Sequence, residues 1–85
     1  MSLRGDEWAG FAQLVYDHIE NYTVPQYGDK GEDLCTDYTP EHCLQQIKKY
    51  TARSGKNQRD DQDVLDLLKI AHYAQMAHTL LTVPQ

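Results

Sequence analysis

The stretch "IKKYTARSGKNQRDDQDVLDLLKIAHYA", residues 47–74, decides the fold that this sequence predicts. It contains the end of one amphipathic helix, a turn with Gly55, and the start of a second helix near Asp60. Glycine at this place is typical of the left-handed residue that ends a helix. Aspartate favours a helix start, because its carboxylate accepts the free backbone N–H groups. We therefore predict a helical hairpin, with helices over about residues 40–54 and 60–81.

The first hairpin helix has a clear start signal and one apolar face. Thr39 can cap it, and Pro40 suits its first turn. Its buried face is expected to contain Cys43, Leu44, Ile47 and Tyr50 or Thr51.

The second hairpin helix is apolar over a wider angle. Its expected face contains Val64, Leu67, Leu68, Ala71, Ala74, Met76 and Leu80 or Leu81. A face of this width predicts that more than one neighbour covers the helix. We therefore expect the protein to form a homo-oligomer.

A third helix is predicted over about residues 6–22. Its apolar positions recur at helical spacing and are Trp8, Phe11, Leu14, Val15 and Ile19. Residues 23–39 are expected to form an ordered loop with a helical turn near residues 30–34, because Pro25, Gly28 and Gly31 oppose a continuous helix. The predicted fold is all-α: one domain over residues 1–85, a small three-helix bundle made of the hairpin and the N-terminal helix.

Composition and charge limit the classes of function. The chain has 85 residues and a net charge of −5. Residues 1–41 contain nine acidic and two basic side chains, whereas residues 42–85 contain four acidic and six basic ones. This is not the even basic surface of a general nucleic-acid binder. No apolar run approaches the length of a membrane span, so we expect a cytoplasmic protein, and two cysteines are too few for a disulfide framework.

Two pairs of carboxylates form a candidate magnesium site. Asp63 and Asp66 lie three residues apart, and so do Asp17 and Glu20. This spacing places both members of a pair on one helix face. If the two helices packed together, four carboxylates would meet, and carboxylate oxygens are ligands that Mg²⁺ prefers. The structural alternative is that Asp63 helps to cap its helix, that Asp66 pairs with Lys69, and that the other pair is solvated.

The basic run before the second hairpin helix is a candidate phosphate site. Lys49 and Arg53 share one helix face, and Lys56 follows in the turn after Gly55. Alternatively, these basic residues complement the dipole at the helix C-terminus. Residues 54–56, Ser-Gly-Lys, lack the rest of a Walker A loop. The four histidines show no short metal-ligand spacing and are interpreted as core or surface residues.

Two stretches resemble a known group of proteins. "QYGDKGEDL" (26–34) resembles the Tyr-Gly-Asp/Asn turn of small helical proteins grouped with nucleotide-modification and MazG-like nucleotide pyrophosphohydrolases. "CLQQIKKYTARSGKNQRDDQDVLDLLKIAHYAQM" (43–76) is similar to their paired helices and to a short phage-encoded domain. The matching positions are Ile47, Lys49, Tyr50, Arg53, Gly55, Lys56, Asp66, Leu67, Lys69 and Tyr73. A first-helix cluster of three glutamates is absent here, and Asp17 and Glu20 would have to replace it.

The resemblance implies an oligomeric helical protein that cleaves a nucleoside triphosphate to a monophosphate and pyrophosphate with Mg²⁺. By position, Asp63 and Asp66 would bind the metal, and Lys49, Arg53 and Lys56 would bind phosphate. We therefore expect a nucleotide-handling protein of phage or prophage type, whose enzymatic activity the sequence leaves open. The alternative is a non-catalytic interaction domain that dimerises through its last helix and contacts a protein partner with residues 26–38.

Overall fold

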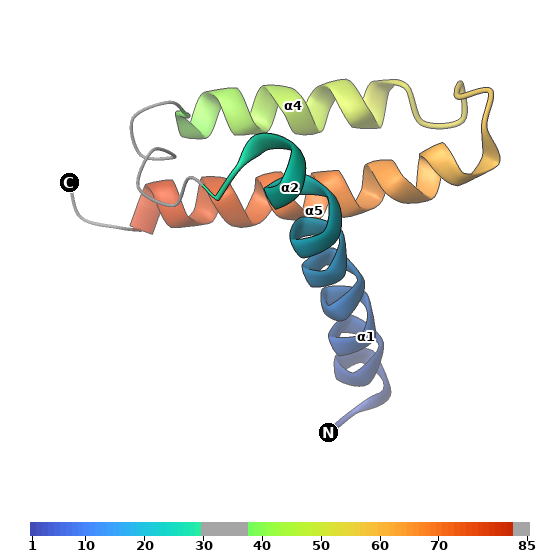
Figure 1. The fold of residues 1–85 in the computed structure, drawn as a ribbon. Coiled ribbons are helices and arrows are strands. Elements are labelled where there is room, and N and C mark those ends of the chain that lie inside the picture. Colours follow the sequence, from blue (N-terminus) through green and yellow to red (C-terminus); the bar gives the residue numbers. More distant parts are fainter. Residues whose placement is uncertain (30–37, 83–85) are drawn as a thin grey trace.

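The structure is a computed structural model that describes residues 1–29 and 38–82. All regular structure in these two ranges is helical, so the predicted all-α class is confirmed. The helices are α1 (Leu3–His18), η1 (Ile19–Thr23), α2 (Val24–Tyr27), α4 (Pro40–Ala52) and α5 (Asp60–Thr82), and Figure 1 shows their arrangement. No helix in the described ranges is both long and apolar enough to cross a membrane.

Helices α4 and α5 lie side by side and form the predicted hairpin (Figure 1). The start of α4 follows the expected cap, because the Thr39 hydroxyl accepts a hydrogen bond from the His42 N–H at 3.1 Å. The turn between the helices contains Gly55 with a φ of 80°, the left-handed conformation that glycine adopts without strain. The expected cap by Asp60 lies outside the described side chains.

The N-terminal helix is longer than predicted. It begins at Leu3, where the Ser2 hydroxyl accepts a hydrogen bond from the backbone of the first turn, and it continues without a break through η1 and α2. We predicted a loop from residue 23 onward, with Pro25 opposing a continuous helix. That prediction was wrong, because helical structure continues to Tyr27. Pro25 lies in the first turn of α2, directly after the wide π-helical turn η1, where its missing N–H is tolerated. Gly28, with a φ of 87°, ends the helix.

The core is small and lies between α4 and α5. Its buried residues are Cys43, Met76, Ala77 and Leu80, with Tyr38 and Tyr73 packed against them. Several residues predicted to be buried are more than half exposed, namely Leu44, Val64 and Leu67; of the alternatives Leu80 and Leu81, Leu80 is the buried one. Helix α4 therefore covers only part of the wide apolar face of α5. The expected helical turn at residues 30–34 and Cys35 lie outside the described residues.

Helix α1 projects away from the hairpin, and its C-terminal part lies near α5 (Figure 1). No residue of α1 is buried, and Trp8 and Leu14 of its predicted apolar stripe are 63% and 56% exposed. The radius of gyration is 13.9 Å. A compact chain of this length would have a radius of about 12 Å. Helix α1 therefore contacts the hairpin through its C-terminal part and leaves most of its side chains exposed.

Candidate functional site

A polar cluster closes the turn end of the hairpin. We call it the Asp66 cluster; it contains Arg53, Asn57, Gln62, Asp63 and Asp66. Arg53 donates two hydrogen bonds to the Asp66 carboxylate, from Nε to Oδ2 at 2.8 Å and from Nη2 to Oδ1 at 2.6 Å. Asn57 and Gln62 donate two more, at 3.3 and 2.9 Å. The carboxylate is buried, and the hydrogen bonds from Arg53 above all lower its pKa to about 2.

Asp63 fixes the turn beside this ion pair. Its Oδ1 accepts a hydrogen bond from Asn57 Nδ2 at 2.6 Å and another from the Gly55 N–H at 3.2 Å. The partner of Asp66 is therefore Arg53 and not Lys69, which was the sequence-based alternative. The amides of Asn57 and Gln62 were not predicted as members of the cluster. The sequence offers one weak sign of their role: both amides lie within ten residues of Asp66, on the same turn and helix start.

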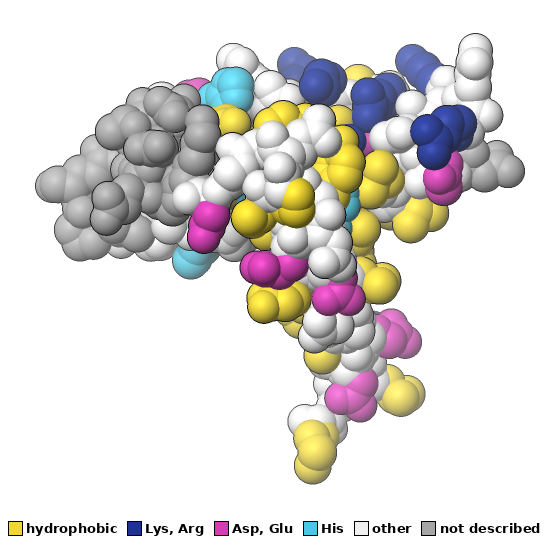
Figure 2. Space-filling view, in the orientation of Figure 1, with side chains coloured by type: hydrophobic (Ala, Val, Ile, Leu, Met, Phe, Trp, Pro, Cys, Tyr) yellow, Lys and Arg dark blue, Asp and Glu magenta, His cyan; other side chains and the backbone are white. Residues whose placement is uncertain are grey.

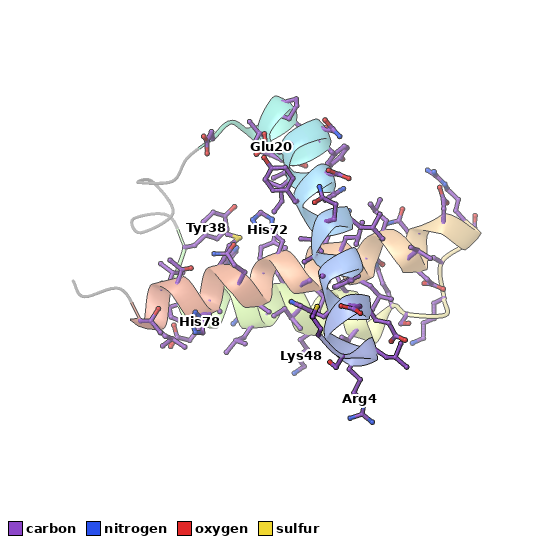
Figure 3. All side chains as sticks on the ribbon, turned by 90° about the horizontal axis from the view of Figure 1, so that it is seen from below. Arg4, Glu20, Tyr38, Lys48, His72 and His78 are labelled. Atoms are coloured by element: carbon purple, nitrogen blue, oxygen red, sulfur yellow. The ribbon has the colours of Figure 1, made fainter. Side chains whose placement is uncertain are left out.

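The Asp66 cluster does not fit a magnesium ion. The Asp66 carboxylate already accepts four hydrogen bonds, which is about its full capacity, and the adjacent guanidinium repels a cation. Asp17 instead accepts a hydrogen bond from Gln13 at 2.9 Å, and Glu20 lies on η1 (Figure 3). Among the described residues, no group of three or more His, Cys, Asp or Glu side chains could hold a metal ion. The expected meeting of Asp17, Glu20, Asp63 and Asp66 is therefore absent from this part of the chain.

Of the three predicted phosphate-binding residues, Arg53 and Lys56 line one shallow hollow at the turn together with Arg59 and Lys69, whereas Lys49 lines a different cavity. Arg53 is held by its carboxylate partner, with its guanidinium carbon 4.8 Å from the centroid of the Tyr50 ring. Lys49 Nζ lies 4.7 Å from the same centroid, and Lys69 Nζ, which was not predicted, lies 5.4 Å from it. Three cations thus surround Tyr50, an arrangement that the negative face of the ring favours. Lys56 lies in the turn, where its N–H donates to the Arg53 carbonyl.

An aromatic cavity lies between the hairpin and the η1–α2 segment. Its volume is about 450 Å³, within the range of small-molecule pockets. Figure 3 shows Tyr38 and His72 on the side of α5 that faces η1. The rings that line the cavity are those of Tyr22, Tyr27, Tyr38, Tyr50, Tyr73, His18, His42 and His72.

These rings form pairs that shape the cavity wall. His18 stacks on Tyr22 with centroids 5.1 Å apart, and the rings of Tyr50 and Tyr73 are 6.1 Å apart and nearly parallel. The first pair comes from the N-terminal helix and the second from the hairpin. The cavity is therefore built by segments that are distant in the sequence, which is why the spacing of residues did not reveal it.

The described lining of the cavity contains three charged side chains. These are the ammonium groups of Lys49 and Lys69 and the carboxylate of Asp29. Burial, and then the nearby Lys69, lowers the pKa of His18, whereas burial and then His18 lowers the pKa of His72. Both imidazoles are therefore neutral at neutral pH. The described lining therefore combines the neutral rings of His18 and His72 with two ammonium groups near Tyr50.

Comparisons of this chain with protein-family models, with curated proteins and with solved structures give no match. The resemblance to MazG-like proteins therefore stays a prediction. Of the three residues predicted to bind phosphate, Lys49 is the one that lines the cavity.

Proposed function

We propose that this protein binds a small ligand with a flat ring and a negatively charged group, best represented by a nucleotide, in the aromatic cavity. One observation carries the proposal: five tyrosines and two lysines converge on a single cavity of about 450 Å³. Either feature alone is common, but a ring-lined wall next to two ammonium groups matches the two parts of a nucleotide. Binding is the function that this arrangement supports, with no assumption about later chemistry.

The rings supply the base-binding part. Aromatic side chains stack on nucleobases with little preference among them, because every base has a flat π-face. The rings of Tyr50 and Tyr73 line the hairpin side of the cavity, and the stacked pair of His18 and Tyr22 lines it from the N-terminal helix. Neutral imidazoles can also donate or accept a hydrogen bond to a base edge.

The lysines supply the anion-binding part. Lys49 comes from α4 and Lys69 from α5, and both ammonium groups lie close to the Tyr50 ring. A phosphate placed between them would meet two positive charges from two helices. Neither lysine has an ion pair with a carboxylate among the described residues. Both are therefore available to a ligand in this part of the structure.

Magnesium-dependent hydrolysis stays a prediction of the resemblance and is not part of this proposal, because the described carboxylates do not gather into a metal site. The alternative of a protein contact through residues 26–38 depends mainly on residues that the structure does not describe. The phage-type origin and the cytoplasmic location also remain predictions from the sequence.

The proposal is tested by calorimetric titration of the protein with mono-, di- and triphosphates of adenosine and uridine, each with and without Mg²⁺. We expect at least one nucleotide to bind, and we expect Lys49→Gln to weaken it about tenfold, the loss of about 1.4 kcal/mol of a charged contact. Lys69→Gln should have a similar effect. The matched control is Lys48→Gln, because Lys48 is the exposed neighbour of Lys49 and does not line the cavity.

Two results would overturn the proposal. The first is that no nucleotide of the panel gives a heat of binding or raises the melting temperature. The second is that Lys48→Gln and Lys49→Gln weaken binding equally, since that would place the phosphate outside the cavity.

A further inference from the structure

Helix α5 has three faces, and the described residues of this chain cover two of them. Asp66 and Met76 belong to the face that packs against α4, and His72 belongs to the face beneath η1. Figure 3 shows His72 and His78 on opposite sides of the helix. The third face contains His78 and is formed by Val64, Leu67, Ala71, Ala74, His78 and Leu81.

The spacing along this third face alternates between three and four residues from Val64 to Leu81. That alternation is the pattern of a and d positions in a coiled coil, where each side chain enters a gap on a facing helix. The large members are strongly exposed: Val64 is 62%, Leu67 56% and Leu81 70% accessible. Apart from His78, the stripe is apolar over most of the helix, and such a stripe differs from scattered surface leucines and marks an interaction surface.

The stripe is symmetric about the midpoint between Ala71 and Ala74. When a second identical helix runs antiparallel across this midpoint, Ala71 faces Ala74 of the other copy and Val64 faces Leu81. The small residues meet at the centre, where the two backbones can approach closely, and large residues close both ends. A helix with this order of sizes is complementary to itself in the antiparallel direction.

The chain exposes more surface than a compact chain of its mass. The chain exposes 6660 Å². A compact chain of the same mass would expose about 5,200 Å². The excess of about 1,500 Å² is nearly twice the area that each partner buries in a standard interface, about 800 Å². The extra exposed area is therefore as large as a stable interface between two chains requires.

We propose that a second copy of this chain covers the third face of α5, with the two α5 helices antiparallel and Ala71 next to Ala74 of the other copy. The aromatic cavity lies on a different side of α5, so this pairing leaves it open. The pairing of chains and the binding of a nucleotide can therefore be tested separately.

The first test is the mass in solution, measured by sedimentation equilibrium. We expect the wild-type chain to show twice its mass of 9.8 kDa at micromolar concentration. Leu67→Glu places a charge in the stripe and should weaken association about a hundredfold or more, to a monomer. The control Gln45→Glu adds the same charge on the exposed surface of α4 and should remain a dimer. A wild-type monomer at about 1 mM, or a Leu67→Glu dimer, would overturn the proposal.

The second test does not depend on the folding of a charged variant. In a Cys35→Ser background, whose remaining native thiol is the buried Cys43, we combine two single variants, Val64→Cys and Leu81→Cys. Antiparallel pairing should give a disulfide-linked dimer from the mixture and little from either variant alone. A linked dimer from Val64→Cys alone would show parallel pairing and overturn the register, and no linked dimer from the mixture would also overturn it.

Discussion

The Asp66 cluster and the aromatic cavity lie along the same helix pair, share the neighbourhood of Tyr50, and are built in opposite ways. In the cluster, each oxygen of the Asp66 carboxylate accepts two hydrogen bonds. In the cavity, about 450 Å³ is unfilled, and Lys49 and Lys69 have no carboxylate partner among the described residues. The charged residues that most resemble a catalytic site therefore hold the hairpin together, whereas the residues available to a ligand are mainly rings.

If the Asp66 cluster holds the hairpin together, Asp66→Ala should lower the free energy of unfolding more than the other variants described below. Removing the carboxylate leaves Arg53, whose side chain is 38% exposed, without its partner. We expect a loss of about 3 kcal/mol in the free energy of unfolding, at the low end for a broken buried pair because water reaches the guanidinium. Urea unfolding measures the loss.

The control for this variant is Asp61→Ala, which breaks the pair of Arg59 and Asp61. Both side chains are about three-quarters exposed, at 74% and 73%, so the expected loss is below about 0.5 kcal/mol. Equal losses in the two variants would contradict a structural role of the cluster.

The free energy of unfolding should decrease in two pH ranges, one set by the cavity histidines and one by Asp66. The lowered pKa values of His18 and His72 mean that the unfolded chain takes up protons first as the pH falls below 6.5, so stability decreases there. The pKa of Asp66 falls from 3.8 to about 2, so its contribution is present above pH 3.8 and is lost between these values. Urea unfolding as a function of pH should therefore show two separate decreases. His72→Gln should reduce the first decrease and leave the second; the reverse result would contradict the assignment.

Two glycine variants give the smallest expected effects, of opposite sign. Gly55 has a φ of 80° in the turn of the cluster, and no atom lies within 4 Å of an added Cβ, so Gly55→Ala should cost about 1 kcal/mol through backbone strain alone. Gly10 lies within α1 with equally open surroundings, and Gly10→Ala should raise the stability by about 0.5 kcal/mol. Thermal unfolding compares them, and a stabilising Gly55→Ala would contradict the left-handed turn.

Local chemistry in the sequence predicts the hairpin well, because caps and helix-ending glycines act within a few residues. Thr39 and Gly55 perform the predicted roles in the structure. The prediction for Pro25 was wrong, because the effect of proline depends on its position in a helix turn. No residue pattern indicated the π-helical turn that precedes it.

The cavity could not be predicted, since its two ring pairs come from segments whose relative placement is set by the packing of α1 against α5. The exposed apolar side chains of α1 had the spacing of a buried stripe, and the spacing gave no sign that this chain alone would leave them uncovered. Figure 2 shows several of these hydrophobic side chains along the projecting helix.

The complete burial of Cys43 gives the protein a natural reporter of its own opening. Its thiol is 0% exposed, and burial raises its pKa, so a thiol reagent cannot attack it while α4 lies against α5. In the Cys35→Ser background, the rate of labelling would therefore count how often the two helices separate under native conditions. Ligand binding and pairing of chains could each be read as a slower rate, without any added probe.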